Sequence, residues 1–214
     1  MFDIIINYRQ FYLSGIGITI LLSALSLLIG SVLGILLAIM KLSKSKILNL
    51  ISLCYIELLR GTPLFVQLSL VYIGIPIVTG ISISPFIGGL IAVGLNSAAY
   101  VAEIIRSGIQ SVDKGQSEAA LSLGLNQKQV MKKIILPQAL KTILPALGNE
   151  FVSLTKETSI VATIGLSDLY YAALKINATT YMYSPFVIAA ILYFLITFTL
   201  SRVLGKIERK LSYE

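Results

Sequence analysis

Three long runs of the sequence contain no charged residue, and they limit the chain to folds that place a large apolar surface away from water. Residues 10–40, 61–102 and 176–201 lack Asp, Glu, Lys and Arg altogether. A helix needs about 20 consecutive apolar residues to cross the hydrocarbon core of a bilayer. Charged residues make up 13% of the chain, whereas soluble domains carry about 25%. The sequence therefore predicts an all-α integral membrane protein.

Shorter apolar stretches lie between these runs and raise the number of expected spans. Pro76, Gly80 and Pro85 interrupt the second uncharged run and indicate a turn near residues 76–84. No internal repeat or linker divides the chain, which predicts a single transmembrane domain over residues 1–214. We expect five transmembrane helices, at about residues 12–40, 47–75, 86–107, 140–160 and 184–205.

The basic residues gather on one side of this five-helix arrangement. Thirteen of the seventeen Lys and Arg residues lie between the first two helices, in or beside the loop 107–141, or near the C-terminus. Basic residues are enriched in cytoplasmic loops of membrane proteins. We therefore expect an external N-terminus, a cytoplasmic C-terminus and a cytoplasmic loop between helices three and four. The net charge of +7 then reflects topology in a lipid membrane, and nucleic acid is not expected as a partner.

The composition also excludes several kinds of chemistry. The chain has no histidine and one cysteine, Cys54, so histidine-dependent catalysis and sites built from several thiolates are excluded. The only Gly-Lys pair, Gly205-Lys206, is followed by Ile207, so no phosphate-binding loop of the G-x-x-x-x-G-K-[ST] type occurs. We predict no catalytic residue, no metal site and no cofactor in this chain. Cys54 is interpreted as a core residue.

The loop 107–141 is patterned as two short helices. Ser117 is predicted to cap a helix over 118–123 that ends at Gly124. Asn126 is predicted to cap a second helix over 127–136, which runs into Pro137. Helices this short are unstable alone, so they are expected either to dock into a groove on another protein or to lie as an ordinary interfacial loop.

The same loop resembles the EAA loop of ABC importer permeases. It matches every named position of the pattern E-A-A-x3-G-x9-I-x-L-P, with Glu118, Ala119, Ala120, Gly124, Ile134, Leu136 and Pro137. The segments 57–63, 99–109 and 156–159 are similar to motifs of the polar amino-acid subgroup of these permeases. On this basis the chain is identified as a member of the type I importer permeases.

The resemblance implies a division of labour among several subunits. The EAA helix would act as a coupling helix in a groove of a cytoplasmic ATP-binding subunit, with contacts from Glu118, Ala119, Ala120 and Gly124. Two copies of that subunit would bind ATP and Mg²⁺ and hydrolyse the ATP, so this chain would not itself be an enzyme. A second permease subunit, expected to be identical, and an extracellular or periplasmic amino-acid-binding protein complete the system. The expected location is the bacterial cell membrane.

Polar residues inside the expected spans are the candidates for binding a substrate. A charged residue at the bilayer centre costs about 2.5–3.5 kcal/mol on insertion scales. Glu150 lies at the midpoint of the helix 140–160 and has no basic residue one turn away on either side. An unpaired acid at this depth favours a cationic ligand, and we hypothesise arginine, lysine or histidine as the transported amino acid.

The helix 86–107 offers a second polar face. Asn96 lies at its midpoint, and Tyr100 and Glu103 follow at i+4 and i+7, which places all three on one side. We expect them to frame the substrate opposite Glu150. The path is expected to continue outward from Glu150 through Ser153, Glu157 and Thr158.

Other readings of these residues remain open. Glu103 could instead pair with Arg106 one turn away, and Glu57 and Arg60 are expected to form a structural ion pair on one helix. The substrate could be a neutral or acidic amino acid such as glutamine or glutamate. An ion-coupled secondary carrier could use the same acids, but it should usually show repeated halves. An intramembrane enzyme lacks a catalytic set here.

Two further patterns are interpreted as structural. Gly30 and Gly34 are spaced as in close helix–helix contacts, either within the chain or between two copies. A cluster of tyrosines is expected at the external membrane interface or against a binding protein, and consists of Tyr170, Tyr171, Tyr181 and Tyr183.

Overall fold

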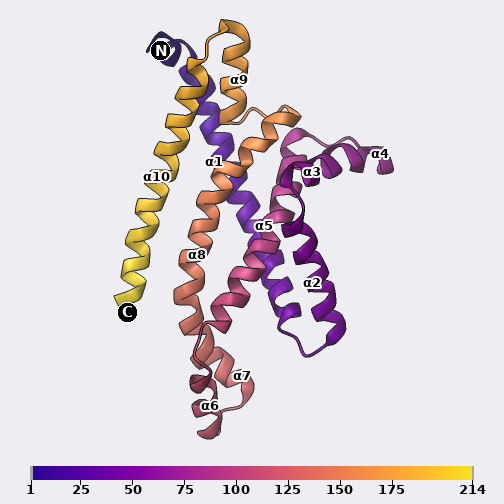
Figure 1. Cartoon of the computed structure of the whole chain (residues 1–214), viewed down its shortest axis with the longest axis vertical. Helices are drawn as coiled ribbons and strands as arrows, with labels where there is room; N and C mark the ends of the chain where they lie inside the picture. The colour runs from indigo at the N-terminus through magenta and orange to yellow at the C-terminus, as the bar shows by residue number, and fades with distance from the viewer. Residues whose placement is uncertain (1, 214) are drawn as a thin grey trace.

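The computed structural model describes the backbone of residues 2–213 and the side chains of residues 3–209, and this part of the chain contains no strand. The helices follow one another along a single polypeptide path (Figure 1). Their bounds are α1 Phe2–Lys41, α2 Lys46–Gly61, α3 Leu64–Ser69, the π turn η1 Leu70–Gly74, α4 Ile75–Thr79, α5 Pro85–Gln110, α6 Lys114–Ser122, α7 Gln127–Val130, the π turn η2 Met131–Ile135, α8 Leu136–Glu157, the 3₁₀ segment η3 Thr158–Ile164, α9 Leu169–Thr180 and α10 Ser184–Tyr213.

Within the described residues, three helices are long and apolar enough to cross a membrane alone. They are α1, α5 and α10, which match the predicted spans 12–40, 86–107 and 184–205. Two further crossings would each require a bent pair of helices, so the structure carries three to five candidate spans. The all-helical membrane fold is confirmed, whereas the count of five remains a prediction.

The predicted helix 47–75 is not one helix. The structure breaks it between Lys46–Gly61 and Leu64–Thr79, which meet at an angle of 105°. Thr62 is extended, with φ −120° and ψ 148°, because Pro63 disfavours a helical residue before it. Since α2 has 16 residues, it is about 24 Å long, which is shorter than the ~30 Å hydrocarbon core.

Both π turns lie just before a proline. Leu70–Gly74 precedes Pro76, and Met131–Ile135 precedes Pro137. A proline removes a backbone donor and crowds the preceding turn, and a π turn is one way to accommodate such a change without ending the helix. The expectation that the second loop helix stops at Pro137 is therefore wrong, because the helix continues directly into α8.

The predicted helix 140–160 is the C-terminal part of one longer helical rod. The rod extends over Gln127–Ile164 and then bends by 46° into Leu169–Thr180. Its C-terminal end tightens into the 3₁₀ segment Thr158–Ile164. This change of winding alters which side chains share a face near Glu157.

Gly30 and Gly34 lie where α1 packs tightly against α5, which confirms the predicted close packing. A Cβ at Gly30 would lie 2.6 Å from Ser97 Oγ, and one at Gly34 would lie 2.7 Å from Val101 Cγ1. Helices lacking side chains at such positions can bring their backbones together in a membrane. Here the partner helix belongs to the same chain.

The two ends of the molecule differ in what they carry (Figure 1). The helices α6 and α7 form one end, together with the C-terminal ends of α1 and α5 and the start of α8. The N-terminus and α9 lie at the other end. The turn after α9 exposes Tyr181 and Tyr183, whose exposed fractions are 91% and 76%. The predicted tyrosine cluster and the predicted coupling loop therefore lie at opposite ends.

Cys54 is exposed on α2, so its interpretation as a core residue is wrong. In a membrane protein an apolar side chain can face lipid as readily as a protein core, because lipid tails are as apolar as Leu. An apolar stretch of sequence therefore does not show which of its residues are buried.

Candidate functional site

The loop helices begin with side-chain caps, although one cap differs from the prediction. Asp113 Oδ1 accepts a hydrogen bond from Gly115 N at 2.7 Å, so α6 begins at Lys114 and Ser117 lies inside it. The predicted start at residue 118 is wrong because Asp113, four residues earlier, is an equally good cap. Asn126 caps α7 as predicted, in a reciprocal arrangement with Gln129 at 3.0 and 2.9 Å.

The EAA residues divide between a packed side and an open side. Ala120 is buried in a small cluster with Val130 and Ile135, which holds α6 against the rod that follows. Glu118 and Ala119 are exposed. Gly124 has φ +86°, a conformation that L side chains rarely adopt, and it turns the chain between the two helices.

Exposed apolar side chains border the open side of α6. Leu123 is 82% exposed and Leu121 is 45% exposed. Leu121 lies on α6 with Glu118 and Ala119, and Leu123 directly follows the helix, at the end of the molecule formed by α6 and α7 (Figure 1). This surface combines a flat alanine, an acid and uncovered leucines, which is suited to contact with a protein groove.

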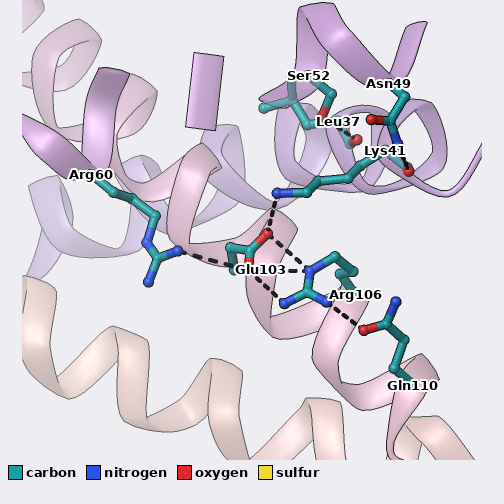
Figure 2. Close-up of polar contacts among 8 residues, drawn as sticks. All are labelled: Leu37, Lys41, Asn49, Ser52, Arg60, Glu103, Arg106 and Gln110. Atoms are coloured by element: carbon teal, nitrogen blue, oxygen red, sulfur yellow. Dashed lines mark hydrogen bonds and ion pairs between the residues drawn. The ribbon is translucent and has the colours of Figure 1, made fainter. Parts of the chain in front are cut away.

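Glu103 lies at the centre of an ion-pair cluster (Figure 2). Its Oε1 is 3.0 Å from Lys41 Nζ, and its Oε2 is 2.8 Å from Arg106 Nη2 and 3.7 Å from Arg60 Nη1. Arg106 also binds Gln110. The cluster joins the ends of α1 and α2 to α5. The structural reading of Glu103 with Arg106 is thus confirmed, and the carboxylate already has partners from three helices.

The predicted ion pair between Glu57 and Arg60 is not formed within 4.0 Å among residues 3–209. Arg60 instead extends toward α5, where its Cζ lies 5.4 Å from the centre of the Tyr100 ring. The prediction was wrong because helical spacing identifies neighbours on one helix but not partners on another. Glu57 remains exposed on α2.

A cavity of about 540 Å³ opens beside the break between α2 and α3. Asn96 and Tyr100 both line it, as expected from their shared face on α5. Asn96 Nδ2 donates to Gln67 Oε1 at 2.9 Å, which ties α5 to α3. The other lining residues are Thr62, Pro63, Leu64, Glu157, Ser159, Ile160, Thr163 and Tyr170.

Glu150 faces α5 from α8. Its Oε1 accepts a hydrogen bond from Ser97 Oγ at 3.2 Å. Among residues 3–209, no Lys or Arg nitrogen lies within 4.0 Å of Glu150 or of Glu157. Glu157 is exposed and lines the cavity two turns further along the rod. Glu157 therefore lines the cavity, whereas Glu150 is partly buried against Ser97, and neither acid has a cation of its own among residues 3–209.

Thr158 does not lie on this path. It is fully buried, donates to Thr155 O at 3.2 Å and lies 3.5 Å from Ser23 Oγ of α1. At about 100° per residue, a position eight residues after Glu150 is rotated by about 80°, whereas the seventh, Glu157, is rotated by only about 20°. Ser153, at i+3, is partly buried.

Several residues that line the cavity were not predicted from the sequence, among them Thr62, Pro63 and Tyr170. Thr62 and Pro63 line it because the chain breaks there, and Tyr170 lines it because the rod bends before α9. The dipeptide Thr62-Pro63 carried a detectable signal, since a residue before proline tends to be extended. Nothing local to Tyr170 indicated its position.

Another acid, Asp168, has a structural role. It is fully buried, and its Oδ1 accepts from Tyr171 N at 2.8 Å while its Oδ2 accepts from Tyr193 Oη at 3.0 Å. The first bond caps α9 and the second fastens it to α10. Asp168 is thus satisfied by neutral donors from two helices.

The fold is that of a helical membrane protein with an exposed loop of two short helices at one end. Residues 30–213 match the family described as the binding-protein-dependent transport system inner membrane component, and the chain belongs to this family. It is a multi-pass inner-membrane permease of the bacterial ABC transporters for amino acids.

Two similar proteins carry different substrate names. The arginine transport system permease protein ArtQ of Bacillus subtilis is 43% identical over 98% of this chain and 96% of its own length. A Rickettsia felis protein, named as a glutamine transport system permease (GlnP), is 41% identical over 99% of both chains. The names therefore agree on amino-acid transport and differ in the amino acid.

Solved structures share the fold. A chain from the crystal structure of an amino acid ABC transporter with histidines has a TM-score of 0.95, is 45% identical and covers 98% of each chain. A chain of the MetNI methionine ABC transporter has a TM-score of 0.79 at 17% identity, and covers 95% of this chain and 97% of its own. The second likeness concerns the fold alone.

Proposed function

We propose that this chain forms part of the translocation path of an ATP-driven importer for a cationic amino acid, namely arginine, lysine or histidine. The observation that carries the proposal is the pair of acids on one face of α8, Glu150 and Glu157, neither of which has an ion-pair partner among residues 3–209. The name of the arginine relative agrees with this substrate class.

Each residue has a distinct role in this proposal. Glu150 binds the side-chain cation or the α-amino group of the substrate, while Glu157 draws cations into the cavity. Asn96 and Tyr100 frame the substrate from α5. Ser153 lies between the two acids on α8 and contributes polar surface. Carboxylates in a low-dielectric site bind cations more strongly than carboxylates in water.

The coupling loop supplies the link to ATP. The open side of α6, with Glu118, Ala119 and the turn at Gly124, would dock into a cytoplasmic ATP-binding subunit, and Ala120 would hold the helix in shape. We propose two ATP-binding subunits, a second copy of this permease and an external binding protein. The N-terminus would then be external and the loop 107–141 cytoplasmic.

Glutamine is the second candidate substrate, because one relative is named for glutamine transport. In that case Glu150 would accept hydrogen bonds from the substrate amide instead of pairing with a cation. Glutamate would require at least one of the two acids to be neutral. An ion-coupled carrier is less well supported, since the family is described by its dependence on a binding protein.

The test compares Glu150→Gln with the unmodified importer in proteoliposomes, with arginine and glutamine as alternative substrates. We expect arginine uptake to fall by about 10- to 100-fold, since a charge-assisted contact is lost, while glutamine uptake changes much less. Glu57→Gln is the matched control, because this acid is exposed on α2. Unchanged arginine uptake in Glu150→Gln would overturn the cationic substrate and leave the permease assignment intact.

A further inference from the structure

Arg60 is held less tightly than the other cations around Glu103. Lys41 and Arg106 lie 3.0 and 2.8 Å from the carboxylate, but Arg60 Nη1 lies at 3.7 Å. Its side chain is also the most exposed of the three, at 41% compared with 15% and 28%. Figure 2 shows it approaching Glu103 from the side opposite Arg106. A carboxylate that is already paired with two closer cations gains little further stabilisation from a third.

Arg60 also lies next to the residues that line the cavity. It belongs to the last turn of α2, immediately before the break at Thr62 and Pro63. Those two residues line the cavity, and so does Tyr100, the ring that the guanidinium covers at 5.4 Å. The guanidinium thus contacts a cavity-lining ring on one side and the Glu103 cluster on the other.

An aromatic face beside a carboxylate is a binding site for a guanidinium or an ammonium group. Arg60 therefore shows that a guanidinium group fits beside both Tyr100 and Glu103. Glu103 is seven residues beyond Asn96 on α5, which corresponds to about 10 Å further toward α6. A cation moving from the cavity toward that end would meet Tyr100 and then Glu103.

We propose that Tyr100 and Glu103 form a second cation site on the transport path, which Arg60 occupies at rest and the cationic side chain of the substrate takes over in transit. This inference rests on the proposed cationic substrate. The exchange brings one cation to the cluster as another leaves, so the charge around Glu103 is conserved. In this exchange the Arg60 side chain moves away from Glu103, and the break at Thr62 and Pro63 allows the movement.

The second site gives the substrate a way to leave the first. Two acids without cations hold a positively charged group strongly, and conduction requires binding that is weak enough, or spread over enough sites, to allow departure. Tyr100 and Glu103 offer the next favourable position. Lys41 and Arg106 keep cation binding at this second site weak, because they already neutralise Glu103.

The absence of tryptophan from the chain allows a direct test. Tyr100→Trp in the assembled importer places a fluorescent ring at the site, and the Tyr100→Phe importer supplies the background emission of the partner subunits. Guanidinium chloride is titrated into Tyr100→Trp with and without Arg60→Ala. We expect saturable quenching, with half-saturation about fivefold lower when Arg60 is removed. Neutral acetamide should produce no saturable change.

Equal half-saturation with and without Arg60, or an equal response to acetamide, would overturn the proposal. If the Arg60→Ala importer does not assemble, Arg60→Lys takes its place. The flexible ammonium is expected to be displaced more easily than the native guanidinium, so equal half-saturation there would also overturn the proposal. The titration does not involve Glu150, so the two proposals can fail separately. The titration can fail while Glu150→Gln still lowers arginine uptake, and it can succeed while Glu150→Gln leaves arginine uptake unchanged.

Discussion

Glu103 and Glu150 lie on two helices that pack together, α5 and α8, yet their carboxylates have opposite surroundings. Glu103 has three cations within 4.0 Å, drawn from α1, α2 and α5. Glu150 has one hydroxyl partner, Ser97, and no cation within that distance among residues 3–209. In this structure the first acid fastens helices together, whereas the second has no cation of its own among residues 3–209. Partners on other helices therefore decide what an acid inside a membrane does.

The largest expected effect is on stability, at Glu103. Glu103→Gln leaves Lys41, Arg60 and Arg106 facing one another without a carboxylate, and breaking a buried ion pair costs about 3–5 kcal/mol. We expect a cost near the lower limit, about 3 kcal/mol, because 17% of this side chain is exposed. The thermal unfolding midpoint of the purified permease should fall clearly. A midpoint equal to that of the unmodified protein would contradict the structural role.

The next effect separates the cations within the cluster. Lys41→Met removes a partner at 3.0 Å and Arg60→Met removes one at 3.7 Å. We expect the first change to cost about 1.5 kcal/mol and the second about 0.5 kcal/mol, since a well-aligned charged hydrogen bond contributes more than a longer, exposed pair. Thermal unfolding of the two variants side by side gives the comparison. A larger cost for Arg60→Met would mean that Arg60 is a structural residue.

The smallest expected effect is on stability at Glu150. Glu150→Gln removes a charge that has no cation and keeps a polar group beside Ser97. A buried polar group costs less than a buried unpaired charge, so the unfolding midpoint should stay the same or rise, even though arginine transport falls. A large loss of stability would show that Glu150 is a structural residue and would remove the contrast with Glu103.

Local signals explain what could be predicted from the sequence, and long-range packing explains what could not. The uncharged runs identified α1, α5 and α10, and the EAA spacing identified the loop, because these signals are local. Prolines were ambiguous: Pro63 follows the break before α3, whereas the rod continues through Pro137 and Pro145. The outcome depends on whether a π turn and neighbouring helices can accommodate the missing donor.

The candidate site shows the same limit. Asn96 and Tyr100 line one cavity, as their shared helix face predicts, while their part in binding a substrate stays a prediction. Thr158 was misplaced because the eighth residue after Glu150 is rotated too far, and Arg60 was misassigned because its partner is on α5. Only the folded arrangement identifies which acids are neutralised.

The central claim is that Glu150 binds the cation of a transported amino acid. The most direct measurement is a structure of the complete importer with arginine bound. We expect a substrate nitrogen within about 3 Å of a Glu150 carboxylate oxygen, beside Asn96 and Tyr100. Arginine bound elsewhere, with Glu150 paired to a Lys or Arg of a neighbouring subunit, would contradict the account.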